Sequence, residues 1–173
     1  ENSFLPKFYK DPERYAFPLE LSFLADRYQQ LKDHFRQPDL FKPITVSDYF
    51  IYKSLIFAGQ NLESAELTLY KRMFEIVSSL VPRPDLLVYL YLPTDQTKQN
   101  IITRGRSYEQ QITLQYLDKI QSGYMEFLKQ LTDWRILLVE TSGIDFVWRG
   151  EDYKWISEIV RKDYPVGITR IGK

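Results

Sequence analysis

Residues 85–92 read Asp-Leu-Leu-Val-Tyr-Leu-Tyr-Leu and lie between Pro84 and Pro93. A near-continuous apolar run of this length, bounded by prolines, is typical of a β-strand buried on both faces in a parallel sheet. Residues 135–140, Arg-Ile-Leu-Leu-Val-Glu, predict a second buried strand, and residues 44–47 a short, weaker one. Because helical stretches alternate with these strands, the sequence predicts an α/β fold whose parallel sheet is covered by helices.

The helices are predicted from apolar residues that recur at alternating steps of four and three, which places them on one helical face. The clearest series lies within residues 11–35: Phe17, Leu21, Leu24, Tyr28, Leu31 and Phe35. Further helices are expected at residues 48–58, 62–80, 94–103, 113–131 and 151–161. Asn61 is expected to be the N-cap of the helix at 62–80. No pattern is found beyond Tyr164 and no linker divides the chain, so we expect one domain over residues 1–173.

The composition argues against several classes of function. The chain has 23 basic and 23 acidic residues, without the basic excess that is usual in proteins that bind polymeric nucleic acid. It has no cysteine, which excludes disulfides and thiolate zinc sites, and its one histidine, His34, does not suffice for a metal site. No apolar run is long enough to span a bilayer. We therefore expect a cytoplasmic protein that has no metal site of its own and binds neither membranes nor polymeric nucleic acid.

Two arginines flank a glycine in the segment Thr-Arg-Gly-Arg-Ser-Tyr-Glu at residues 103–109. The guanidinium groups of Arg104 and Arg106 are planar, permanently charged donors that suit phosphate oxygens. Gly105 would let the backbone flex, as a lid that closes over a nucleotide requires. The competing interpretation is a helix that ends at Gly105, with basic residues that complement its dipole. The spacing alone favours this second interpretation.

Two other segments place polar groups where a ligand is expected. Tyr9 and Glu20 lie in an aromatic-rich stretch, and such a mixture suits hydrogen bonds to a sugar and a base; alternatively, Tyr9 packs in the core and Glu20 faces solvent. Asp48 follows the short strand expected at 44–47, the position at which open α/β sheets place active sites. The competing interpretation is that Asp48 is the N-cap of the helix that follows it, and this role alone is sufficient to explain an acidic residue there. The sequence contains no G-x-x-x-x-G-K-[ST] phosphate loop.

Together and in this order, four segments resemble the deoxynucleoside kinase family: residues 9–18 (YKDPERYAFP), 47–62 (SDYFIYKSLIFAGQNL), 84–90 (PDLLVYL) and 104–109 (RGRSYE). The resemblance covers about residues 2–147. It implies a P-loop nucleoside-kinase-like fold that lacks the first strand and the phosphate loop, so we expect the chain to be part of a longer protein. Residues 47–62 look especially like the bacterial form that is fused behind a 6-hydroxymethyl-dihydropterin pyrophosphokinase of folate biosynthesis.

The resemblance implies that the full-length protein transfers the γ-phosphate of ATP, with Mg²⁺, to the 5′-hydroxyl of a deoxynucleoside. Arg104 and Arg106 would be the arginines of a lid at about residues 103–112 and would neutralise charge on the transferring phosphate. Asp48 would be the acidic residue that follows the strand in the family. The arginine expected directly after it is absent, because residues 48–50 are Asp-Tyr-Phe. We expect the chain by itself to be inactive.

The resemblance also implies roles in holding the nucleoside. Tyr9 and Glu109 would bind the 3′-hydroxyl of the deoxyribose, and Phe57 would stack on the base. Glu20 occupies the position at which the family usually has a base-recognising glutamine. A carboxylate accepts a hydrogen bond from an exocyclic amino group but cannot donate one to a ring nitrogen. Adenine or cytosine would therefore suit Glu20 better than thymine.

The missing arginine supports an alternative function. The kinase-like chain would then be a non-catalytic dimerisation or regulatory module of a bifunctional folate-biosynthesis pyrophosphokinase. The apolar seams of the predicted helices also exceed what a helix needs to cover one sheet. We therefore expect a homodimer that packs through helices, partly by analogy with the family.

Overall fold

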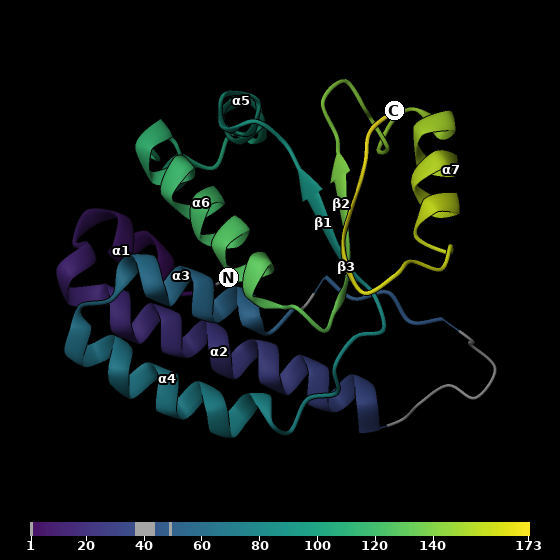
Figure 1. Cartoon of the computed structure of the whole chain (residues 1–173). Coiled ribbons are helices and arrows are strands. Elements are labelled where there is room, and N and C mark those ends of the chain that lie inside the picture. Colours follow the sequence, from purple (N-terminus) through teal and green to yellow (C-terminus); the bar gives the residue numbers. More distant parts are fainter. Residues whose placement is uncertain (1, 37–43, 49) are drawn as a thin grey trace. The chain divides into compact units, whose positions relative to one another are not determined.

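The chain forms two compact units in the computed structural model, which describes residues 2–36, 44–48 and 50–173 (Figure 1). Unit 1 comprises Glu1–Arg83 and unit 2 comprises Pro84–Lys173. The expectation of a single domain over residues 1–173 stays a prediction.

The described part of unit 1 consists of helices, whose bounds are α1 Leu5–Lys10, α2 Pro12–Arg36, α3 Tyr52–Asn61 and α4 Ser64–Ser78. Helix α2 confirms the helix predicted at 11–35 and continues through Pro18. Helix α4 confirms the one predicted at 62–80. Helix α2 packs against α1, α3 and α4, so its residues can reach each of the other helices of the unit.

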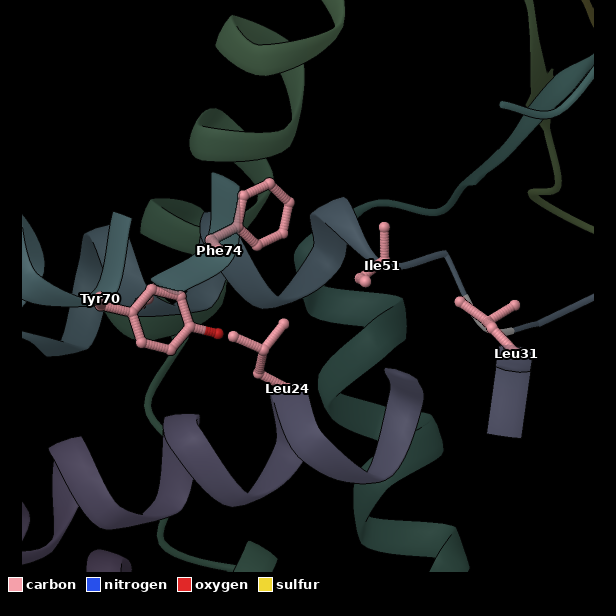
Figure 2. Close-up of a cluster of buried hydrophobic side chains, with 6 residues drawn as sticks. Leu24, Leu31, Ile51, Tyr70 and Phe74 are labelled. Carbon is pink, nitrogen blue, oxygen red and sulfur yellow. The ribbon is translucent and has the colours of Figure 1, made fainter. Parts of the chain in front are cut away.

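The core of unit 1 lies where the predicted apolar faces of α2 and α4 meet. Leu24 of α2 points toward the rings of Tyr70 and Phe74 on α4, and all three side chains are buried (Figure 2). The ring of Tyr52 on α3 meets that of Phe74 edge to face, with centroids 5.1 Å apart. The apolar periodicity of the sequence therefore predicts the residues that α2 and α4 contribute to this cluster, whereas a second cluster of Phe8, Ala16 and Leu19 lies outside the predicted face of α2.

The prediction of a short strand at residues 44–47 is wrong. These residues are irregular, and Ile44 and Val46 are 59% and 85% exposed. A β-branched segment becomes a strand only when it pairs with a neighbour, and the described residues of unit 1 contain no strand for it.

The helix expected at residues 48–58 is displaced along the chain. Helix α3 begins at Tyr52 and continues through Gly59 to Asn61, because a glycine inside a helix costs only about 1 kcal/mol. The expectation that Asn61 is an N-cap is therefore wrong, and Glu63 precedes the first residue of α4.

Unit 2 is a parallel three-stranded sheet flanked by helices, in the strand order β1-β2-β3. Its strands are β1 Leu87–Tyr91, β2 Arg135–Glu140 and β3 Gly167–Ile171, and its helices are α5 Thr94–Arg104, the 3₁₀-helix Ser107–Glu109, α6 Leu114–Gln130 and α7 Gly150–Ile159. Helices α6 and α7 lie on opposite sides of the sheet (Figure 1). On one side, Leu137 and Val139 of β2 pack against Ile159 of α7. On the other, Tyr89 of β1 stacks on Tyr124 of α6 with centroids 5.3 Å apart. The predicted α/β fold with a parallel sheet is confirmed.

The strands differ from the sequence prediction in two respects. The strand predicted at 85–92 exists, but only Leu87 is fully buried in it and Leu90 is 43% exposed. Strand β1 is an edge strand in the described sheet, whereas the strand predicted at 135–140 is central and buried. The tail also contains a strand, β3, that the sequence does not predict. Its five residues include Thr169 and Arg170, and its strand conformation depends on pairing with β2.

Among the described residues, no helix is both long and apolar enough to cross a bilayer.

Candidate functional site

Glu20 is buried in the interior of unit 1. It is 2% exposed, so the interpretation that it faces solvent is wrong. The side-chain amide of Asn61 on α3 donates a hydrogen bond of 2.7 Å to Glu20 Oε1, and the hydroxyl of Tyr70 on α4 donates one of 3.4 Å to the Glu20 main-chain carbonyl. Glu20 Oε2 has no hydrogen-bond partner in the described part of the chain. One carboxyl oxygen is therefore fixed and the other is unsatisfied.

Burial raises the pKa of Glu20 to about 7, although the Asn61 hydrogen bond and the charge of Arg27 act to lower it. Arg27 engages other groups: it donates to the hydroxyl of Ser54 at 2.7 Å, and its guanidinium lies over the ring of Phe23, 5.2 Å from the centroid. Near neutral pH the carboxyl of Glu20 therefore exists in both its neutral and its charged form.

A second cation lies near Arg27. Burial lowers the pKa of Lys53, the charge of Arg27 lowers it further, and Asp48 acts in the opposite direction. Lys53 Nζ is 5.9 Å from the centroid of the Phe57 ring, the ring to which the family resemblance assigns stacking on the base. Unit 1 thus combines a buried carboxyl, two cations and an aromatic ring.

Sequence reasoning did not predict the roles of Arg27, Ser54 and Asn61 in this cluster. Their spacing in the sequence could have indicated these roles. Arg27 follows Glu20 by seven residues, and Asn61 follows Ser54 by seven, which is about two helical turns and returns to the same face. Two packed helices that each carry such a polar pair on their facing sides indicate a buried polar network.

The other unit 1 residues singled out from the sequence lie in different environments. Tyr9 is half-buried on α1 and packs beside Phe8, with ring centroids 5.5 Å apart. Asp48 is exposed and precedes α3 by several residues, and the position before that helix is occupied by Ile51. The interpretation of Asp48 as an N-cap is therefore wrong.

Arg104, Arg106 and Glu109 form one ion-pair cluster in unit 2. Arg104 Nη2 lies 2.5 Å from Glu109 Oε2, and Arg106 Nη1 lies 3.2 Å from Glu109 Oε1. The carboxylate is largely buried, whereas both arginine side chains are about half exposed. Each oxygen of Glu109 therefore holds one guanidinium, and each guanidinium keeps part of its surface in contact with solvent.

The segment around this cluster is held in a defined conformation. Helix α5 ends at Gly105, whose φ of 73° is in the left-handed region that favours glycine. The helix-terminus interpretation of this segment is thus confirmed. Lys98 Nζ donates to the main-chain carbonyls of Gln110 and Ile112, which ties α5 to the chain beyond the 3₁₀-helix.

The predicted site residues belong to two different units of the chain. Tyr9, Glu20 and Phe57 belong to unit 1, and the arginine cluster belongs to unit 2. Unit 2 also has a hollow of about 620 Å³ at the carboxyl ends of its strands, lined in part by Tyr91 and Glu140. The predicted site residues do not line this hollow.

The comparisons with known proteins agree on one family. The family model for deoxynucleoside kinases matches residues 1–163. The deoxyguanosine kinase of Bacillus subtilis is 32% identical, over 94% of this chain and 80% of that protein. The deoxyadenosine kinase of Dictyostelium discoideum is 28% identical, over 95% of this chain and 65% of that protein. The solved structure of a deoxyadenosine kinase from M. mycoides with bound dATP superposes with a TM-score of 0.70 at 22% identity, over 94% of this chain and 82% of that one.

Proposed function

We propose that this chain, which belongs to the deoxynucleoside kinase family, is part of an enzyme that transfers the γ-phosphate of ATP to the 5′-hydroxyl of a deoxynucleoside. The structural observation that supports the proposal is the buried carboxyl of Glu20 with its unsatisfied Oε2. A buried polar atom without a partner costs stability. The hydrogen-bonding edge of a nucleobase would supply the missing partner.

We assign Arg104 and Arg106 to the transferring phosphate. Their guanidinium groups would neutralise the charge on the phosphoryl oxygens as it shifts during transfer. In the structure both groups are bound to Glu109, and a buried carboxylate is costly to leave without a partner. We assign Glu109 to the 3′-hydroxyl of the sugar. This hydroxyl would take the place of one guanidinium on the Glu109 carboxylate when that guanidinium moves to the phosphate.

Mg²⁺ would accompany ATP, as the family resemblance implies. Within the described ranges, no three side chains of the His, Cys, Asp or Glu types gather to hold a metal ion. Mg²⁺ in kinases is usually held by only one or two carboxylates together with the phosphates of the nucleotide and water. No step of the reaction is assigned to the ion.

The remaining assignments concern the nucleoside. Phe57 would stack on the base, Tyr9 would join Glu109 on the 3′-hydroxyl, and Glu20 would recognise the edge of the base. Asp48 keeps only its proposed place near the phosphates. Its exposure and its position outside any helix give that role no structural support.

The proposal is tested by assaying the full-length protein with ATP and each of the four deoxynucleosides, with the 5′-monophosphate quantified by chromatography. We expect turnover with at least one of them and none with this chain alone, which has no phosphate-loop motif. Arg104→Gln and Arg106→Gln should each reduce turnover strongly. Arg72→Gln, the same change at an exposed position of α4, should leave turnover unchanged. Absence of turnover with every deoxynucleoside would refute the proposal.

A second candidate function is a non-catalytic dimerisation module. Helix α4 and the turn that follows it expose an apolar stripe formed by Leu69, Ile76 and Leu80, which are 48%, 69% and 64% exposed, and such a stripe favours packing against a second copy. Homodimerisation through α4 is compatible with either function.

The likeness of residues 47–62 further supports fusion behind a hydroxymethyl-dihydropterin pyrophosphokinase, which sequencing of the full gene would test.

A further inference from the structure

The carboxyl of Glu20 is held so that its two oxygens differ. The amide of Asn61 donates to Oε1 at 2.7 Å, while Oε2 is buried without a hydrogen-bond partner in the described part of the chain. An amide N–H donates to an acceptor oxygen in both the neutral and the charged form of a carboxyl group. When a proton is present, it therefore resides on Oε2 and leaves Oε1 to Asn61.

The groups around Glu20 do not fix its charge. On its own helix, Arg27 lowers the pKa of Glu20 through its charge, but its guanidinium donates to Ser54. Lys53 on α3 lies near Arg27 and is itself disfavoured as a cation by burial. On α4, the hydroxyl of Tyr70 is directed to the Glu20 main chain, and the pKa of that phenol is raised, so it stays neutral.

We propose that Glu20 recognises different base edges in its two protonation states, and that Asn61 positions Oε2 for both. As a neutral carboxyl, Oε2 donates to a ring nitrogen or carbonyl oxygen of the base. As a carboxylate, Oε2 accepts from an exocyclic amino group. The inference rests on the proposed function, and it adds that base selectivity depends on pH. The usual glutamine of the family presents both a donor and an acceptor at every pH and would give no such dependence.

Two purine nucleosides distinguish the neutral form of the Glu20 carboxyl group from the charged form. Deoxyadenosine has an exocyclic amino group from which a carboxylate can accept a hydrogen bond. Purine 2′-deoxyriboside lacks that group and has only acceptor nitrogens on its base, so only the neutral carboxyl can hydrogen-bond to it. Burial raises the pKa of Glu20 to about 7, so the neutral fraction falls from about nine tenths at pH 6 to about one tenth at pH 8.

The experiment measures kcat/KM of the full-length protein for both nucleosides between about pH 6 and pH 8. We expect the ratio of deoxyadenosine to purine 2′-deoxyriboside to rise at least about tenfold over this range, and to be independent of pH in Glu20→Gln. The exposed control Glu75→Gln should retain the wild-type dependence. Effects of pH on phosphoryl transfer that are common to both substrates cancel in the ratio.

A ratio that does not change with pH, while both nucleosides are phosphorylated, would overturn this inference and leave the proposed function intact. Failure to phosphorylate any deoxynucleoside would overturn the proposed function itself. Calorimetric titration of the wild-type protein gives a second measurement that does not depend on the folding of a variant. At about pH 8, binding of purine 2′-deoxyriboside should take up close to one proton, whereas binding of deoxyadenosine should not. Equal proton uptake for both nucleosides would also overturn the inference.

Discussion

Replacement of Glu20 by glutamine should make the stability of the chain less sensitive to pH. The carboxyl ionises near 4.5 when unperturbed, but burial raises its pKa to about 7 in the fold. Between these values the folded chain holds a proton that the unfolded chain has lost, so stability decreases as pH rises. At about 1.4 kcal/mol for each pH unit, the loss approaches about 3 kcal/mol above pH 7. Glutamine does not ionise and avoids this loss.

The measurement is urea unfolding of wild type and Glu20→Gln, followed by far-UV circular dichroism at about pH 4.5 and about pH 8. The free energy of unfolding of the variant, relative to wild type, should increase by up to about 3 kcal/mol between the two conditions. Because the difference between variant and wild type is compared at two pH values, any effect of glutamine on packing that does not depend on pH cancels. Glu75→Gln alters an exposed position of α4 and should show almost no change. An equally flat result for Glu20→Gln would show that Glu20 is not a buried, neutralised carboxyl.

Three further predictions follow from the packing, the ion-pair cluster and the exposed stripe. Phe74→Ala removes a buried ring from the core of unit 1 and should lower the free energy of unfolding by about 3–5 kcal/mol in urea titrations; a loss below about 1 kcal/mol would contradict the described packing. Glu109→Gln should raise KM for a deoxynucleoside at least about tenfold but alter KM for its 2′,3′-dideoxy analogue little, and equal effects would argue against contact with the 3′-hydroxyl. Ile76→Lys should convert a dimer into a monomer in light scattering, whereas the neighbouring Glu75→Lys should not.

Those parts of the fold that depend on local apolar patterning could be predicted from the sequence. Residues 135–140 and the periodic residues of α2 specify a strand and a helix that the structure contains at nearly the same bounds. Strand β3 could not be predicted, because Gly167–Ile171 gains strand conformation by pairing with β2. The same dependence on a partner explains why residues 44–47, for which the sequence predicts a strand, do not form one.

The candidate site was predictable in residue identity but not in environment. The order of the motifs singles out Glu20, Arg104, Arg106 and Glu109, and the last three form one ion-pair cluster. The spacing of Glu20 and Arg27 places both on one face of α2, but it indicates burial only once α2 is known to pack against α3 and α4. The role of Asn61 depends on the same packing.

The most direct test is a crystal structure of the full-length protein with a deoxynucleoside and a non-hydrolysable ATP analogue. We expect the base to stack on Phe57 with its edge within hydrogen-bonding distance of Glu20 Oε2. The 3′-hydroxyl should bind Glu109, and the guanidinium groups of Arg104 and Arg106 should contact phosphate oxygens. A complex in which both arginines remain on Glu109, with the base bound away from Glu20, would contradict the account.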